Sequence, residues 1–243
     1  MFVLPYNKDN PVRKTPWVVF ALIFINGLVL IGEYVGGPPQ TWFASHGFIP
    51  EHASISTAFT SMFLHAGFWH YAGNMFFLWM FGNRVENIFG RWLFAATYLA
   101  SGFGATYFYY VLNLHSTIPC VGASGAISGI AGCFLVLFPK ARFDLVFYLG
   151  WIQLKSIETN AFAAVLTWFG EQTVLGLISS TFRVAGGVAY WAHFGGFVVG
   201  AIFALAFSMV FDIKERETRD VEEPQDPLQP SSEDLTELKL RNQ

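Results

Sequence analysis

Six long stretches of apolar residues constrain this chain more than any other feature of its sequence. They cover approximately residues 17–34, 60–82, 92–112, 124–138, 160–179 and 187–211. An α-helix needs about 20 mostly apolar residues to cross the hydrocarbon core of a bilayer, which is about 30 Å thick. Only 13% of the 243 residues are charged, against roughly 25% in an ordinary soluble domain. We therefore predict an all-α polytopic membrane protein with six transmembrane helices.

Basic residues predict the orientation of these helices, because short cytoplasmic loops of membrane proteins collect Lys and Arg. Of the basic residues next to the predicted helices, all but Arg183 lie on the side that holds both termini: Lys8, Arg13, Lys14, Arg84, Arg91, Lys140, Arg142, Lys155, Lys214, Arg216 and Arg219. The pattern predicts a protein of the inner (plasma) membrane with both termini in the cytoplasm.

The same pattern divides the chain into three parts. We expect a cytoplasmic N-terminal segment at residues 1–16, a six-helix membrane domain at 17–212 and a charged, disordered cytoplasmic tail at 213–243. Residues 143–151 are apolar but too short to cross a bilayer, so we expect them to form an interfacial part of an inner loop. The outer segment 36–56 is expected to lie in the membrane interface as well. Nothing in the sequence suggests nucleic-acid binding.

Strongly polar side chains inside the apolar stretches are candidates for function, because they are costly to bury in a membrane. A helix rises 1.5 Å per residue, which puts Ser124 about 8 to 10 Å and His193 about 9 Å below the outer surface. His70 and Asn74 are expected about two turns into their helix from the same side. Serine is a weak nucleophile until a base takes its proton, so a hydroxyl and an imidazole at equal depth suit an activated serine.

Two serines compete for this role in the sequence VGASGAISGIAG, residues 121–132. Ser124 lies at the predicted helix start, where unpaired N–H groups favour a developing oxyanion, whereas Ser128 lies one turn deeper. Ser124 is therefore the candidate nucleophile and His193 the candidate base. His70 and Asn74 share one helix face, and we predict that they and Gly122 stabilise the oxyanion. Gly122 would also let the chain bend into the site and leave its backbone free to approach a substrate.

The helices that carry the two candidate residues have small side chains at regular spacing. Gly125, Gly129 and Gly132 line the fourth stretch, and Gly196 and Gly200 line the sixth. Small residues let helix backbones approach closely in lipid. We expect these two helices to be neighbours.

Other polar residues have simpler interpretations. A serine in an Ala/Gly-rich helix often bonds to its own backbone, and the motif GxSG alone is weak evidence for catalysis. Glu171 is interpreted as a buried carboxyl bonded to a neighbouring helix. Cys120 and Cys133 are too far apart along one helix for a disulfide. Glu33, His46 and His52 are expected at the interface and are too scattered for a metal site, so we predict no metal.

With these residues identified, the chain resembles the rhomboid family of intramembrane serine proteases. The resemblance covers residues 16–212 and is carried by His70 and Asn74 as a His-xxx-Asn pair, by GxSG with Ser124, and by His193 in YWAHFGG. It implies a six-helix rhomboid-like bundle that cleaves transmembrane substrate proteins in the lipid bilayer with a Ser-His dyad, without a metal or cofactor. Two features depart from the family pattern: the first loop lacks a Trp-Arg pair, and Ser128 stands where an aromatic residue often braces the histidine.

Two other functions compete with proteolysis. A catalytically inactive rhomboid-like protein could bind membrane helices without cutting them, although such relatives generally lose the serine or the histidine. A transporter could use Glu171 and the buried histidines as a proton path, but the two repeated halves of many transporters are not evident. A soluble α/β-hydrolase is excluded because GASGA is not the G-x-S-x-G nucleophile elbow and no strand precedes it.

Overall fold

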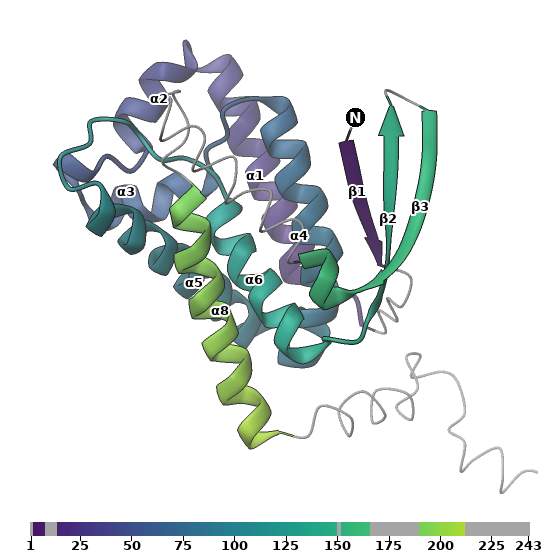
Figure 1. The fold of residues 1–243 in the computed structure, drawn as a ribbon. Helices are drawn as coiled ribbons and strands as arrows, with labels where there is room; N and C mark the ends of the chain where they lie inside the picture. Colours follow the sequence, from purple (N-terminus) through teal and green to yellow (C-terminus); the bar gives the residue numbers. More distant parts are fainter. Residues whose placement is uncertain (1, 8–13, 150–151, 166–189, 212–243) are drawn as a thin grey trace, which may run out of the picture.

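The computed structural model describes residues 2–7, 14–149, 152–165 and 190–211, and these residues are mostly helical (Figure 1). The longest elements are the helices α1 (Trp17–Val35), α4 (Phe68–Phe89), α5 (Arg91–Leu112), α6 (Ser124–Leu137) and α8 (Tyr190–Val210). Shorter helices α2 (Pro39–His46), η1 (Pro50–His52), α3 (Ile55–Thr60) and η2 (Ser61–Phe63) connect α1 to α4. Residues 161–165 are also helical. The predicted tail at residues 213–243 lies outside the described residues.

Helix α6 forms the centre of the helical bundle, in contact with α4, α5 and α8 (Figure 1). Its residues are buried from Gly125 to Phe134 without interruption. Glycines allow its closest contact, because a Cβ atom on Gly196 or Gly200 of α8 would collide with a backbone carbonyl of α6. The Sγ of Cys133 also donates a hydrogen bond to the Gly200 carbonyl oxygen at 3.0 Å. The prediction that these two helices are neighbours is therefore confirmed.

Helix α1 is attached to the bundle through hydrogen bonds with two side chains of α4. The Glu86 carboxylate of α4 accepts the N–H groups of Val18 and Val19, each at 2.9 Å. These are among the first N–H groups of α1, which have no acceptor inside their own helix. A little over one turn further along α1, the Tyr71 hydroxyl donates to the Ile23 carbonyl oxygen at 3.2 Å. Side chains of α4 thus fix both the start and the middle of α1.

A three-stranded antiparallel sheet corrects the all-α prediction. Strand β1 (Phe2–Asn7) pairs with β2 (Arg142–Leu149), which pairs with β3 (Ile152–Asn160) in the order β1-β2-β3, beside the helices (Figure 1). The stretch expected as an interfacial loop segment is therefore mostly strand. Its Phe, Leu, Val and Tyr residues favour strands as well as membrane interfaces, and hydropathy does not separate the two. The pairing with the distant N-terminal segment stabilises the strand.

The second predicted transmembrane segment is shifted along the chain relative to the structure. Its helix α4 begins at Phe68 and ends at Phe89, whereas we predicted residues 60–82. Gly67 precedes it with φ +128°, and Gly90 with φ +74° both ends α4 and begins α5. These backbone conformations are readily accessible only to glycine. The shift places His70 in the first turn of its helix rather than two turns inside it.

Two helices among the described residues combine enough length and hydropathy to cross a membrane. They are Trp17–Val35 and Trp191–Val210, and the apolar helix Ser124–Leu137 is shorter. The side chains are distributed as in a membrane protein, with large apolar residues such as Phe24, Trp92 and Met209 exposed. Asn26 and Glu33, in contrast, are fully enclosed. Glu33 lies near the end of α1, and its expected depth at the membrane interface stays a prediction.

The α6–α8 contact generates a prediction about stability. Gly200→Ala places a methyl group against the Gly129 carbonyl, a backbone atom that cannot rotate away. We expect a loss of about 1–3 kcal/mol in the free energy of unfolding, the usual range for an overpacked core. Gly73→Ala in α4 is the matched control, because no heavy atom lies within 4 Å of its added Cβ. Thermal unfolding of the two variants in detergent measures the difference, and equal midpoints would contradict it.

Candidate active site

Ser124 and His193 meet at the contact between α6 and α8. The distance between His193 Nε2 and Ser124 Oγ is 2.7 Å, which is within hydrogen-bonding range. Ser124 is the first residue of α6, and His193 lies in the first turn of α8 and is 8% exposed. Residues 69 positions apart in the chain are thus brought together in the geometry of a nucleophile and its base.

Ser128, the competing serine, is engaged elsewhere. Its side chain is fully buried, and its Oγ donates to the Ser124 carbonyl oxygen at 2.8 Å. This bond within one helix is a common arrangement for a buried helical serine. The geometry therefore favours Ser124 over Ser128 as the reactive hydroxyl.

Gly122 shapes the entry of the chain into α6. Its φ is +129°, a value that disfavours any residue with a Cβ atom. An added Cβ would also lie 2.9 Å from Cε1 of His70. The Gly122 N–H donates to the Ser61 carbonyl oxygen at 2.8 Å. The Gly122 N–H thus has an acceptor, and the absence of a side chain leaves room for the His70 ring. The expected part of Gly122 in oxyanion stabilisation stays a prediction.

His70 presents one ring nitrogen to the site. Its Nδ1 accepts the Ala66 N–H at 3.2 Å, so Nδ1 carries no proton and the neutral ring carries its proton on Nε2. A Cβ on Gly122 would lie 3.2 Å from His70 Nε2 and 3.5 Å from Ser124 Oγ, so both atoms border the same small space. His70 is therefore a hydrogen-bond donor facing the reactive serine.

Asn74 lies one turn after His70 on the same helix face, as predicted, and its side chain is buried. Its Nδ2 donates to the His70 carbonyl oxygen at 2.9 Å. An amide nitrogen has two protons, so one remains for a further acceptor. Unlike Ser124 and His193, Asn74 does not line the cavity described next.

A small cavity borders the two central residues. Its volume is about 20 Å³, enough for about one water molecule. The α5 residues Gly102, Ala105 and Thr106 form part of its wall. Cys120 also lines it, but burial raises the pKa of this thiol to about 12. Because the thiolate is the nucleophilic form of cysteine, Cys120 is a poor alternative to Ser124.

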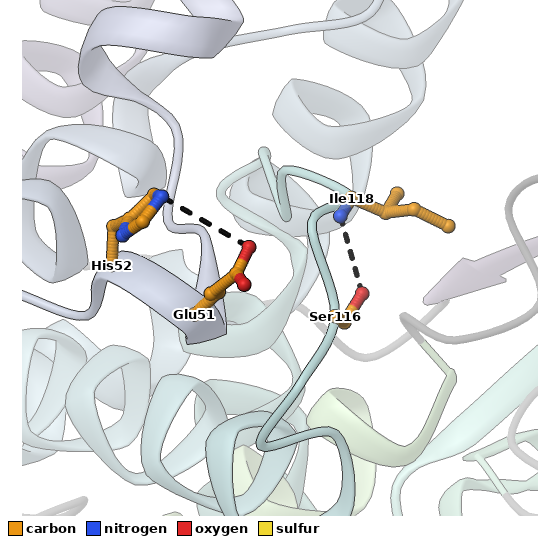
Figure 2. Close-up of polar contacts among 4 residues, drawn as sticks. All are labelled: Glu51, His52, Ser116 and Ile118. Atoms are coloured by element: carbon orange, nitrogen blue, oxygen red, sulfur yellow. Dashed lines mark hydrogen bonds and ion pairs between the residues drawn. The ribbon is translucent and has the colours of Figure 1, made fainter.

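Two loops are joined next to this site. Phe48 and Cys120 exchange two backbone hydrogen bonds, at 3.0 and 2.8 Å. The Glu51 N–H donates to the Ser116 carbonyl oxygen at 3.2 Å. Figure 2 shows the local contacts on either side of this junction, between Glu51 and His52 and between Ser116 and Ile118. The loop before α4 and the loop before α6 therefore hold each other in place.

Two backbone groups of the site were missed by the sequence analysis. The Ser61 carbonyl orients Gly122, and the Ala66 N–H sets the tautomer of His70. No side-chain pattern could have identified either, because the interacting atoms are present in almost every residue. Glu171 and most of the fifth predicted transmembrane segment lie outside the described residues. Within the described parts of the chain, no group of three or more His, Cys, Asp or Glu residues could hold a metal ion.

Comparison with known proteins identifies similar sequences. A family model described as "Rhomboid domain" matches residues 52–210, which include all of the candidate site. The protein "Rhomboid protein 1, mitochondrial" of Saccharomyces cerevisiae is 31% identical over 168 residues, 65% of this chain and 43% of the yeast protein.

Two further relatives match shorter parts of the chain. "RHOMBOID-like protein 1" of Arabidopsis thaliana is 32% identical over 149 residues, 61% of this chain and 33% of that protein. "Presenilin-associated rhomboid-like protein, mitochondrial" of Bos taurus is 35% identical over 89 residues, 36% of this chain and 24% of that protein. The aligned part of this chain spans less than half the length of each of these three relatives.

The geometry predicts which serine reacts with an active-site probe. A fluorophosphonate should label the detergent-purified protein at Ser124, because its hydroxyl lies 2.7 Å from a largely buried imidazole nitrogen that can accept its proton. Ser124→Ala and His193→Ala should each abolish labelling, whereas Ser128→Ala should retain it. Peptide mapping of the labelled protein decides the matter. Label on Ser128 would contradict the assignment.

Proposed function

The chain belongs to the rhomboid family, and we propose that it is an intramembrane serine endopeptidase that hydrolyses peptide bonds of transmembrane substrate proteins. Ser124 is the nucleophile and His193 is the general base of the proposed dyad. The observation that carries the proposal is the 2.7 Å distance between Ser124 Oγ and His193 Nε2. Both residues are needed for cleavage, so their joint presence disfavours the alternative of an inactive protein that binds membrane helices.

The proposed reaction has two stages. His193 Nε2 takes the proton of Ser124 as Oγ attacks the scissile carbonyl carbon, and then gives this proton to the leaving amine. The product is an acyl-enzyme on Ser124. In the second stage His193 takes a proton from the water that attacks the ester carbonyl, and then gives this proton to Ser124 Oγ as the bond from Oγ to the acyl carbon breaks. The cavity of about 20 Å³ beside both residues has room for this water.

The oxyanion formed in each stage needs hydrogen-bond donors. We assign this role to the Nε2–H of His70 and the side-chain amide of Asn74, together with the N–H of Ser124 at the start of α6. Ala123 provides no side-chain cap to this helix, which leaves its first N–H groups to the substrate. The assignment of His70 is supported by its tautomer and by the narrow gap at Gly122.

The proposal places the enzyme in a lipid bilayer with six transmembrane helices. Two of them meet the length and hydropathy expected for a crossing segment, and α4 and α5 are long enough to cross. The distribution of Lys and Arg supports cytoplasmic termini. We also propose a plasma-membrane location for this chain, although two of the relatives are named as mitochondrial proteins. The substrates proposed are membrane-anchored proteins, and no cofactor is part of the mechanism.

The oxyanion assignment predicts how two variants behave. His70→Ala or Asn74→Ala should lower kcat by about 10- to 1000-fold, the range for loss of one oxyanion donor, with little change in KM. A suitable substrate is a single transmembrane helix with Gly and Ala near its outer end, because a regular helix hides its scissile carbonyl from attack.

Ser128→Ala serves as the control, since its hydroxyl bonds only within α6 and faces no substrate. Turnover and KM are measured separately for each variant. An increase confined to KM would show that His70 or Asn74 contributes to substrate binding and not to oxyanion stabilisation. Absence of cleavage by an intact, fluorophosphonate-reactive protein would favour a more restricted substrate than the model helix.

A further inference from the structure

Glu33 is a carboxyl group buried in an otherwise apolar helix. It lies near the end of α1 and is only 1% exposed. Removing a carboxyl from water is costly, and such residues in membrane helices are retained mainly where they interact with a specific partner. The partner here is the backbone N–H of His65, which donates to Glu33 Oε1 at 3.0 Å. This bond joins α1 to the short turn that precedes α4.

The turn connects Glu33 to the proposed oxyanion donor. His65 gives its N–H to Glu33, and the next residue, Ala66, gives its N–H to Nδ1 of His70. The His65 ring packs edge-on against the His70 ring, with centroids 5.3 Å apart. Two consecutive backbone N–H groups therefore connect the two residues: that of His65 is bound by Glu33 of α1, and that of Ala66 donates to His70.

The bond from Ala66 decides which nitrogen of His70 carries the proton. A neutral imidazole has one N–H and one acceptor nitrogen, and an N–H donor at Nδ1 fixes the proton on Nε2. If the turn rotated and withdrew the Ala66 N–H, the other tautomer would become accessible. His70 would then present a lone pair to the oxyanion in place of a proton.

We propose that Glu33 is a positioning residue for His70. Its Oε1 holds the turn at residues 64–67 so that Ala66 keeps His70 in the Nε2–H form that faces Ser124. The inference rests on the proposed function for its effect on turnover, but its effect on the His70 tautomer is independent of that function. It assigns to the first helix a part in a site otherwise built from α4, α6 and α8.

Other buried polar groups of the same region do not have this connection. Asn26, two turns earlier on α1, donates to the Leu22 carbonyl of its own helix. Glu86 of α4 binds N–H groups at the opposite end of α1. Glu33 differs from both because its hydrogen bond ends one residue away from a group that contacts His70.

Three substitutions of Glu33 separate geometry from charge. Glu33→Gln keeps an oxygen acceptor at the same reach, Glu33→Asp keeps the charge but is one methylene shorter, and Glu33→Leu removes the acceptor at similar volume. We expect Glu33→Leu and Glu33→Asp to lower kcat for the model transmembrane substrate by about 10- to 100-fold with KM unchanged, as for a slightly misplaced catalytic group. Glu33→Gln should retain most of the wild-type activity. Asn26→Leu, the matched buried variant on the same helix, should cleave at the wild-type rate.

A double-mutant cycle then tests whether Glu33 acts through His70. In a His70→Ala background, Glu33→Leu should cause no further loss of kcat, because its target is absent. Losses that multiply would overturn the proposal and indicate a general structural role. So would higher activity in Glu33→Asp than in Glu33→Gln, since that order would make the charge, not the reach, the important property.

Nitrogen NMR of ¹⁵N-histidine-labelled protein in detergent gives a readout that does not depend on cleavage. The His70 signals, assigned by their loss in His70→Ala, should report the Nε2–H tautomer in the wild type and in Glu33→Gln. Glu33→Leu should add the Nδ1–H form. An unchanged tautomer in Glu33→Leu would overturn the proposal even if the enzyme is active. A wild type with the expected tautomer but no cleavage or fluorophosphonate reaction would instead contradict the proposed function alone.

Discussion

The close backbone contact between α6 and α8 is the interaction on which the rest of the structure depends. At Gly196 and Gly200 no atom larger than hydrogen fits between the two helices. In lipid, where apolar surface alone does not drive helices together, such close packing is a principal source of association. Because Ser124 and His193 each lie at the beginning of one of these helices, the same contact that stabilises the bundle also sets the distance between hydroxyl and imidazole.

A second set of interactions joins α1 to α4 and to the turn that precedes α4, through hydrogen bonds of two buried carboxylates. Glu86 of α4 binds the beginning of α1, and Glu33, near the end of α1, binds the turn that precedes α4. Both carboxylates bind backbone N–H groups that have no partner in their own helix or turn. Buried acceptors of this kind fix the position of a helix along its neighbour more specifically than apolar packing does, because a hydrogen bond tolerates little displacement. These bonds help to fix the position of the N-terminal end of α4, which carries His70.

The sequence analysis identified features that depend on the type of side chain, and it missed features that depend on hydrogen bonds of the backbone. Hydropathy and residue type identified the helical character of the chain, the family and the pair Ser124 and His193. The sheet was missed because the partner of β2 is the distant segment Phe2–Asn7, and strand pairing is non-local. The buried position of Glu33 was missed because its partner is a main-chain N–H, which has no sequence signature.

By itself the sequence determined that the chain is apolar, helical and equipped with a serine and a histidine near the same ends of neighbouring helices. Glycine spacing also determined that these helices could approach, since small residues permit close contact whatever their environment. Only the tertiary structure decided which hydrogen bonds are already used. It showed that Ser128 and Gly122 are engaged by backbone atoms and that His70 is held in one tautomer. Hydrogen bonds are directional, so donor and acceptor roles follow from the relative placement of atoms far apart in the chain.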